Sequence, residues 1–311
     1  MARYPEREPV EAKAADFLKV NQSQMLLTNG VDEAIHLLCQ TYLEPGDEAL
    51  IVVPTYSMYR IYMMAAGARV HTIGAAKDFR FPADDVLSRI TPRTRMIAIA
   101  NPNNPTGTVV PPEELLRIAA AAPASALLVD EAYFEFYGQT LMSKCRELPN
   151  LFVARTFSKA YGMAGLRVGV LVGHEDQMCA VRLVCSPYNV NAVALACLPA
   201  ALADQSFIQQ YVDEVLQSRT HVESALAASG IQYWASQANF VLARVGSNPA
   251  ASAAFVAKMR ERGILVRDRS SDPGCEGCVR VTLGSRSHTD RFLAALPEVL
   301  RHLCVPQGAS L

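Results

Sequence analysis

Short runs of apolar, often β-branched residues alternate with longer stretches of helical periodicity through the first half of the chain. The runs at residues 49–53, 96–100, 126–129, 151–154 and 168–172 have the length and composition of buried strands. Buried strands that alternate with helices usually form a parallel sheet covered on both faces. The pattern therefore predicts an α/β fold built on a mostly parallel sheet.

The pattern changes in the C-terminal third. Residues 199–228 are predicted to form one long helix, and a final helix is expected from about residue 289. New strand signals follow the long helix, at residues 239–244, 264–267 and 278–283. This second pattern is typical of a smaller α+β domain, without any repeat or low-complexity linker before it.

We therefore predict three parts. Residues 1–20 form an N-terminal segment, residues 21–205 form the large domain, and residues 206–311 form a connecting helix and a small domain. The boundary between the second and third parts is the least defined of these limits.

Polar or aromatic residues follow four of the predicted strands directly. They are the segments PTY at 54–56, NPNNPTG at 101–107, DEAY at 130–133 and TFSK at 156–159. In open α/β sheets, ligands bind beyond the carboxyl ends of the strands. Each segment alone has a simple structural explanation as a turn or a helix cap, but four at one edge of the sheet predict an active site.

Lys159 is the most informative residue of that edge. Thr156, Ser158 and Arg167 surround it in sequence and supply hydroxyl and guanidinium donors suited to a phosphate. A lysine beside a bound phosphate can act as an electrostatic ligand or as a Schiff-base nucleophile. These neighbours alone do not decide between the two roles.

Composition and charge narrow the class of partner. The chain has 311 residues, half of them hydrophobic, and a formal net charge of -1. No block of Lys and Arg marks a surface for nucleic acid or membrane. The first residues lack the apolar core of a secretory signal, and no later apolar run reaches membrane-spanning length. We expect a cytoplasmic protein that acts on small molecules.

The cysteines do not suggest a disulfide framework. Eight are scattered along the chain, and Cys39, Cys179 and Cys197 lie in apolar helical stretches, as reduced core thiols do. Cys275 and Cys278 form a single CxxC pair without a second pair at zinc-site spacing. We predict no metal site, and the role of this pair stays open.

Five segments together carry a family resemblance: TNGVDEAIHLL, PTYSMY, NPNNPTG, VDEAYFEF and RTFSKAYGMAGLRVG. They resemble fold-type I pyridoxal-phosphate aminotransferases, and in detail the histidinol-phosphate aminotransferase family. The resemblance implies a large mostly parallel sheet domain and a smaller α+β C-terminal domain. It also implies transfer of an amino group between histidinol phosphate and 2-oxoglutarate or glutamate, a step of histidine biosynthesis, with pyridoxal 5'-phosphate as cofactor.

The same resemblance implies roles around the cofactor ring. Lys159 would form the Schiff base and move the proton, and Asp130 would pair with the ring nitrogen. Asn104 and Tyr133 would donate to the phenolic oxygen of the ring, while Tyr56 would stack on its face. Lys159, Asp130 and Tyr133 are thus the predicted catalytic residues.

The phosphate and the partner subunit follow from the same matches. The resemblance assigns the phosphate to Thr156, Ser158, Arg167 and the backbone of Gly30, Val31 and Asp32. Gly30 is predicted to open a helix, whose free N–H groups and dipole favour an anion. Tyr4 matches a tyrosine that reaches the phosphate of the neighbouring subunit, which implies a homodimer.

Two arginines match the anion-binding residues of the family. Arg267 and Arg280 would hold the phosphate of histidinol phosphate in one half-reaction and carboxylates of glutamate in the other, because a guanidinium fork fits both. Asn104 and Asn239 are also predicted to face the substrate. The stretch at residues 186–191 is typical of the family as well, but no role follows for it.

One departure from the family concerns the N-terminus. Members usually carry some tens of residues before the Arg-Tyr-Pro segment, including a turn that folds over the substrate, whereas Tyr4 stands almost at the start here. Either the sequence starts late in the gene, or the protein is a divergent member with an open site, and the residues do not decide between the two. Turnover and the choice of substrate stay open.

Four other functions share parts of this pattern. An aromatic or broad-specificity aminotransferase is the strongest rival, and a pyridoxal-phosphate decarboxylase or lyase of the same fold would keep Lys159 and Asp130. A cofactor-binding protein without catalysis would follow if the lid were essential. A nicotinamide-dependent dehydrogenase is disfavoured, because no G-x-G-x-x-G turn follows the first strand.

Overall fold

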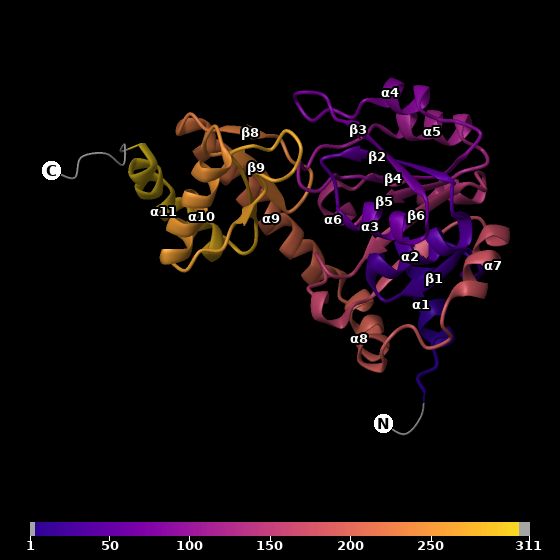
Figure 1. The fold of residues 1–311 in the computed structure, drawn as a ribbon. Coiled ribbons are helices and arrows are strands. Elements are labelled where there is room, and N and C mark those ends of the chain that lie inside the picture. The colour runs from indigo at the N-terminus through magenta and orange to yellow at the C-terminus, as the bar shows by residue number, and fades with distance from the viewer. Residues whose placement is uncertain (1–3, 305–311) are drawn as a thin grey trace.

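The fold comes from a computed structural model that describes residues 4–304, and it consists of two sheets joined through a long helix (Figure 1). The large sheet has seven strands in the order β1-β7-β6-β5-β4-β2-β3. Its strands are β1 (Met25–Thr28), β2 (Glu48–Val53), β3 (Arg69–Gly74), β4 (Thr94–Ala100), β5 (Ala126–Asp130), β6 (Leu151–Thr156) and β7 (Gly169–Val172).

The sheet is mostly parallel, as the sequence pattern predicts. Strands β3, β2, β4, β5 and β6 pair in parallel, whereas β7 runs antiparallel to both β6 and β1. The five predicted strands of the large domain are confirmed as β2, β4, β5, β6 and β7. Strands β1 and β3 were not predicted, because β1 has only four residues and β3 carries polar side chains at three of its six positions.

Helices cover both faces of the large sheet (Figure 1). Successive side chains of a strand point to opposite faces of the sheet, so both faces can be buried. Ile97 and Ile99 of β4 pack into one core cluster, and Met96 and Ala98 pack into the other. The first cluster includes residues of α1 (Glu8–Leu18), α4 (Ala83–Ser88), α5 (Pro112–Ala121) and α8 (Ala192–Ala203). The second includes residues of α2 (Gly30–Tyr42), α3 (Met58–Ala65) and α7 (Glu175–Val184).

The small sheet has four antiparallel strands in the order β10-β11-β9-β8. They are β8 (Gln232–Trp234), β9 (Phe240–Arg244), β10 (Arg267–Asp268) and β11 (Cys278–Thr282). Helices α10 (Pro249–Glu261) and α11 (Arg286–Cys304) pack with this sheet around Phe240, Phe255 and Met259. The expected α+β C-terminal domain is therefore present.

Two boundaries differ from the predicted ones. The single helix expected at 199–228 is wrong, because α8 ends at Ala203 and α9 (Gln205–Ala228) begins after Asp204. Asp204 has a non-helical backbone and its carboxylate accepts a hydrogen bond from the Phe207 N–H at 3.3 Å, so it starts a new helix. The strand expected at 264–267 is reduced to the two residues of β10.

No single helix among residues 4–304 is long and apolar enough to cross a membrane. Helices α8 and α9 together reach the required length and hydrophobicity, but the chain bends by 80° between them.

Candidate active site

A cavity of about 180 Å³ lies at the carboxyl ends of β4, β5 and β6. Ten of the residues predicted from the sequence line it, although they come from five separate segments of the chain. They are Val31, Asp32, Tyr56, Asn104, Asp130, Tyr133, Thr156, Ser158, Lys159 and Arg167. The lining also includes five residues to which no individual role was assigned from the sequence, namely Tyr59, Ala100, Pro102, Ala132 and Ala164.

Asp130 is the last residue of β5 and is 5% exposed. Both of its carboxylate oxygens are held, Oδ2 by the Tyr59 hydroxyl at 2.6 Å and Oδ1 by the Ala132 N–H at 3.0 Å. Burial raises the pKa of Asp130 to about 6, although these two hydrogen bonds and the charge of Lys159 oppose the rise. At neutral pH the buried carboxylate is therefore largely ionised and can hold a cationic ring nitrogen.

Lys159 follows β6 and faces the same cavity. Its Nζ lies 5.6 Å from the centre of the Tyr133 ring. Burial lowers the pKa of Lys159, and the positive charge of Arg280 lowers it further, against the opposing charge of Asp130. A lowered pKa increases the fraction of neutral amine, which is the form that attacks a carbonyl or accepts a proton.

Tyr133 and Asn104 connect the cavity to the small domain. Tyr133 is 6% exposed, and its ring meets that of Phe240 edge to face with centroids 5.1 Å apart. Burial raises the pKa of Tyr133 to about 12, so its hydroxyl stays protonated and can donate a hydrogen bond. Asn104 accepts a hydrogen bond from Arg280 Nη1 at 2.6 Å, while the Nε of Arg280 is buried without a partner among the described residues.

Another set of groups in and beside the cavity suits a phosphate. The hydroxyl of Ser158 is buried without a hydrogen-bond partner among the described residues. Gly30 opens α2 with φ +76°, and a Cβ there would lie 2.6 Å from Nη2 of Arg167. A Cβ on Gly169 would lie 3.1 Å from the Val31 nitrogen. An unpaired donor and a glycine cradle at a helix N-terminus are the features that phosphate binding requires.

Arg167 is held in place by an ion pair to Asp32 at 2.9 Å, and Asp32 also accepts the Tyr56 hydroxyl at 2.7 Å. The side chain of Arg167 keeps 43% exposure, so it is accessible for an anion. Thr156, Ser158, Arg167 and the start of α2 at residues 30–32, here called the phosphate wall, offer donors that fit the chemistry of pyridoxal phosphate.

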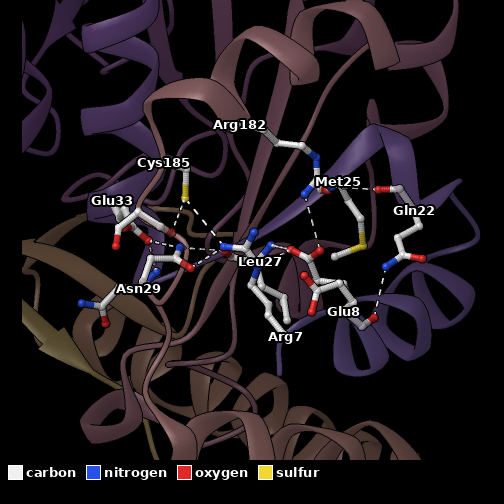
Figure 2. Close-up of polar contacts among 12 residues, drawn as sticks. Arg7, Glu8, Gln22, Met25, Leu27, Asn29, Glu33, Arg182 and Cys185 are labelled. Carbon is white, nitrogen blue, oxygen red and sulfur yellow. Dashed lines mark hydrogen bonds and ion pairs between the residues drawn. The ribbon is translucent and has the colours of Figure 1, made fainter. Parts of the chain in front are cut away.

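The β1–α2 connection that forms this wall is fixed from behind by a polar network (Figure 2). The buried Glu11 accepts the Leu27 N–H at 2.9 Å and pairs with Arg7 at 3.2 Å and Arg182 at 3.5 Å. Arg182 also donates to the carbonyl of Met25. These contacts attach the N-terminal helix α1 to the strand that leads into Gly30.

Besides Gly30 and Arg280, three predicted residues lie outside the cavity lining. Tyr4 is 74% exposed and stacks on Tyr188 with ring centroids 4.1 Å apart. Arg267 is exposed on β10, directly opposite Arg280 in the register of β10 and β11. Asn239 is 8% exposed and immediately precedes β9. The binding roles of these three residues stay predictions.

Two residues near the site were missed by the sequence reasoning. Tyr59 lies in the first turn of α3, whereas Tyr56 precedes this helix, and its contact with Asp130 depends on tertiary packing that no local pattern encodes. Arg269 lies two positions after Arg267 and influences the pKa values of both Tyr133 and Arg280. Strand alternation was its signal, because residues two apart share a face.

The CxxC pair does not line this cavity. Cys275 and Cys278 are fully buried free thiols that pack with Trp234 and Phe79. Within the described part of the chain, no group of three or more His, Cys, Asp or Glu side chains could hold a metal ion.

A family model for class I and II aminotransferases matches residues 2–296. The chain belongs to this family. The match covers both domains, so the protein is an aminotransferase with the fold-type I architecture that its sequence pattern predicts.

Named relatives are similar over nearly the whole chain. A histidinol-phosphate aminotransferase of Geobacillus sp. is 35% identical over 97% of this chain and 83% of its own length. Histidinol-phosphate aminotransferase 1 of Thiobacillus denitrificans is 37% identical over 96% of this chain and 78% of its own. The solved histidinol-phosphate aminotransferase of Sinorhizobium meliloti in complex with pyridoxal 5'-phosphate has a TM-score of 0.90 and 27% identity, over 97% of this chain and 84% of its own.

Proposed function

We propose that this aminotransferase moves an amino group between histidinol phosphate and 2-oxoglutarate or glutamate, with pyridoxal 5'-phosphate linked to Lys159. The observation that carries the proposal is the convergence of Lys159, Asp130 and the phosphate donors on one cavity. The names of the sequence relatives support the choice of substrate.

The cofactor, when bound, supplies a conjugated ring that accepts the electrons released when the substrate loses a proton. Lys159 provides the amine for the covalent link and, once released by the substrate, carries a proton as general base and acid. Asp130, through its ionised carboxylate, would hold the ring nitrogen in its protonated form. Asn104 and Tyr133 would donate to the phenolic oxygen of the ring, and Tyr56 would stack on the ring.

The phosphate of the cofactor is assigned to the wall that carries Ser158, Thr156, Arg167 and the start of α2 at Gly30, Val31 and Asp32. Helix N-termini favour anions because their first N–H groups have no partner within the helix. The unpaired hydroxyl of Ser158 supports the assignment, since a buried donor without a partner is destabilising until a ligand satisfies it.

Arg280 and Arg267 are assigned to the substrate anions. Arg280 reaches the cavity through its bond to Asn104, and Arg267 lies beside it across the β10–β11 pair. Histidinol phosphate carries a phosphate and no carboxylate, so its site must bind a dianion at a distance from the reacting carbon. Two neighbouring guanidinium groups match this requirement. Asn239 is retained as a substrate-side residue of the same domain.

The active form is proposed to be a cytoplasmic homodimer in which Tyr4 reaches the cofactor phosphate of the partner subunit. The exposure of Tyr4 and its position outside the cavity lining of its own chain support this role. Mixed dimers test it. A Lys159→Ala subunit is paired with a Tyr4→Phe subunit, so that the one site with Lys159 belongs to the Tyr4→Phe chain. That site should keep its full activity if Tyr4 acts from the partner subunit, whereas reduced activity there, or a fully active monomer, would refute the proposal.

The substrate is tested by a panel of amino donors. Histidinol phosphate, phenylalanine, tyrosine, glutamate and threonine phosphate are each supplied with and without an oxo-acid acceptor, and transfer of the amino group is measured. Histidinol phosphate with 2-oxoglutarate should give the highest kcat/KM and produce glutamate. A preference for phenylalanine would favour an aromatic aminotransferase. Release of CO2 from threonine phosphate without any acceptor would favour a decarboxylase.

A further inference from the structure

The segment Ser186-Pro187-Tyr188-Asn189-Val190-Asn191 has no role in the proposed chemistry, yet it touches both turns of the phosphate wall. Val190 is 2% exposed and anchors the segment in the core of the large domain. The amide side chains of Asn189 and Asn191, on either side of it, contact two different parts of the chain.

Asn189 holds the turn that enters α2. Its Nδ2 donates to the Leu27 carbonyl at 2.9 Å and to the Glu33 carboxylate at 2.6 Å. The same Glu33 oxygen accepts the Asn29 N–H at 2.5 Å, so Asn189 and Glu33 together fix the residue before Gly30. Figure 2 shows Leu27, Asn29 and Glu33 joined in this network.

The orientation of the Asn189 amide is determined by its neighbours. Its Oδ1 accepts a hydrogen bond from Arg7 Nη1 at 2.6 Å, and both hydrogens of its Nδ2 are used by Leu27 and Glu33. A flipped amide would place its oxygen against a carbonyl and a carboxylate, which repel it. Asn189 therefore links the N-terminal segment to the start of α2 in one geometry only.

Asn191 holds the other turn. Its Nδ2 donates to the Leu166 carbonyl at 2.7 Å, directly before Arg167. Its Oδ1 accepts the Ala194 N–H at 2.9 Å and caps α8. Arg167 has a left-handed backbone with φ 52°, a conformation that a residue with a side chain adopts only when its surroundings hold it. Asn191 is one of the groups that does so.

We propose that Asn189 and Asn191 are positioning residues that hold both turns of the phosphate wall in register. Neither contacts the phosphate, and each acts through a backbone group next to a residue that does. The proposal rests on the assignment of this wall to the cofactor phosphate. Preorganised donors bind an anion more tightly because the turn is ordered before the ligand arrives.

The test compares two probes on the protein freed of cofactor. Pyridoxal 5'-phosphate and pyridoxal differ only in the phosphate, and the dissociation constant of each is measured by titration. Asn189→Ala should weaken binding of pyridoxal 5'-phosphate by about ten- to a hundredfold, because it removes a hydrogen bond to a charged group. Binding of pyridoxal should change less than twofold, since pyridoxal does not use the wall.

A second variant separates the turn from the helix cap. Asn191→Ser keeps an N-cap hydroxyl for α8 but is too short to reach Leu166, so only the contact to the turn is lost. It should weaken binding of pyridoxal 5'-phosphate by about fivefold while leaving the thermal midpoint of the cofactor-free protein nearly unchanged. This variant keeps the proposal testable if Asn189→Ala fails to fold.

The matched control is Asn150→Ala. Asn150 also donates twice to backbone carbonyls, those of Ala119 and Ala122 at 2.9 Å each, but none of these residues lines the cavity. It should lower stability without changing the ratio of the two dissociation constants. The proposal is overturned if Asn189→Ala weakens both probes equally or neither. Failure of the proposed function would appear separately, as absence of amino transfer in the unmutated protein.

Discussion

The residues predicted for the cofactor (the cofactor end) and the two arginines predicted for the substrate (the substrate end) differ in how firmly their polar groups are held. At the cofactor end, Asp130 is bonded on both oxygens and Arg167 is paired with Asp32, while the Ser158 hydroxyl is left without a partner among the described residues. At the substrate end, Arg280 donates to Asn104 while its buried Nε has no partner among the described residues, and Arg267 is exposed at the short strand β10. Asp130 and Arg167 are thus held before any ligand binds, whereas the substrate end depends on the small domain.

This difference has a physical cause. Asp130 and Lys159 stand at or just after the ends of the central strands β5 and β6, in a sheet that is packed on both faces, so their backbones are fixed by the core. Of the two arginines predicted for the substrate, Arg267 stands on β10 at the edge of the four-stranded sheet, and Arg280 stands on the inner strand β11. An edge strand of two residues offers fewer contacts to hold a side chain. Substitutions at the cofactor end should therefore change the chemistry, and those at the substrate end should change selectivity.

The largest effect is expected for Lys159→Ala. The variant loses the covalent link and the proton carrier together, so amino transfer should fall by about four orders of magnitude or more. Cofactor binding through the phosphate wall should persist. Borohydride treatment followed by mass spectrometry should show the cofactor mass on the unmutated chain and on the control Lys144→Ala, at an exposed lysine, but not on Lys159→Ala. Labelling of another lysine would contradict the assignment.

Asp130→Asn should lower the rate of amino transfer by about a hundredfold or more, because an uncharged side chain no longer holds the protonated ring nitrogen. The amide can still accept from the Ala132 N–H and donate to the Tyr59 oxygen, so the fold should be kept. A rate near that of the unmutated enzyme would remove Asp130 from the mechanism.

The same variant has an opposite effect on stability. The pKa of Asp130 is about 6 in the folded protein, against 3.8 for an unperturbed aspartate, so its stabilising contribution is complete below pH 3.8 and is lost as pH rises through 6. At pH 7 the buried carboxylate is ionised and destabilises the fold, whereas at acid pH it is neutral. Asp130→Asn should thus raise the unfolding free energy of the cofactor-free protein at pH 7 by about 3 kcal/mol more than it does at acid pH. Urea unfolding at several pH values measures this difference.

At the substrate end, Arg280→Ala and Arg267→Ala should differ in their effects on two amino donors, histidinol phosphate and phenylalanine. Loss of one bidentate contact costs about 1.5 to 3 kcal/mol, which is roughly a ten- to a hundredfold loss in kcat/KM. Arg280→Ala should harm histidinol phosphate and phenylalanine alike, whereas Arg267→Ala should harm histidinol phosphate much more. Arg286→Ala, at an exposed arginine paired with Asp290, is the control. An unchanged ratio in Arg267→Ala would refute the histidinol-phosphate assignment.

The smallest effect is expected for Tyr59→Phe, which removes one donor from Asp130 and leaves the other. The pKa of Asp130 should rise, and the rate of amino transfer at pH 7 should fall by about tenfold. Carbon-detected NMR of the labelled carboxyl in the cofactor-free protein measures the pKa directly. Tyr42→Phe is the matched control, because Tyr42 donates to Gln177 over the same 2.6 Å but does not line the cavity. Equal pKa values in both variants would show that Tyr59 is only structural.

Much of the site could be predicted from the sequence because its residues follow apolar runs directly. Asp130 and Lys159 stand at or just after the ends of β5 and β6, and parallel strands bring such positions to one edge. The helix break at Asp204 was missed, since residues 199–228 are continuous in helical character and only the non-helical backbone of Asp204 interrupts them. The strand expected at 264–267 was predicted too long, because whether apolar residues form a strand depends on the residues with which they pair.

The sequence by itself determined which chemical groups meet, because the alternation of apolar runs and polar turns specifies the edge at which Lys159, Asp130 and Asn104 appear. Only the tertiary structure decided how these groups are supported. Tyr59 meets Asp130 across 71 positions, and Asn189 meets Glu33 across 156. No local pattern encodes such pairs, since each depends on how helices and loops from distant segments pack over the sheet. The chemistry is local in the sequence, and its preorganisation is a property of the packed fold.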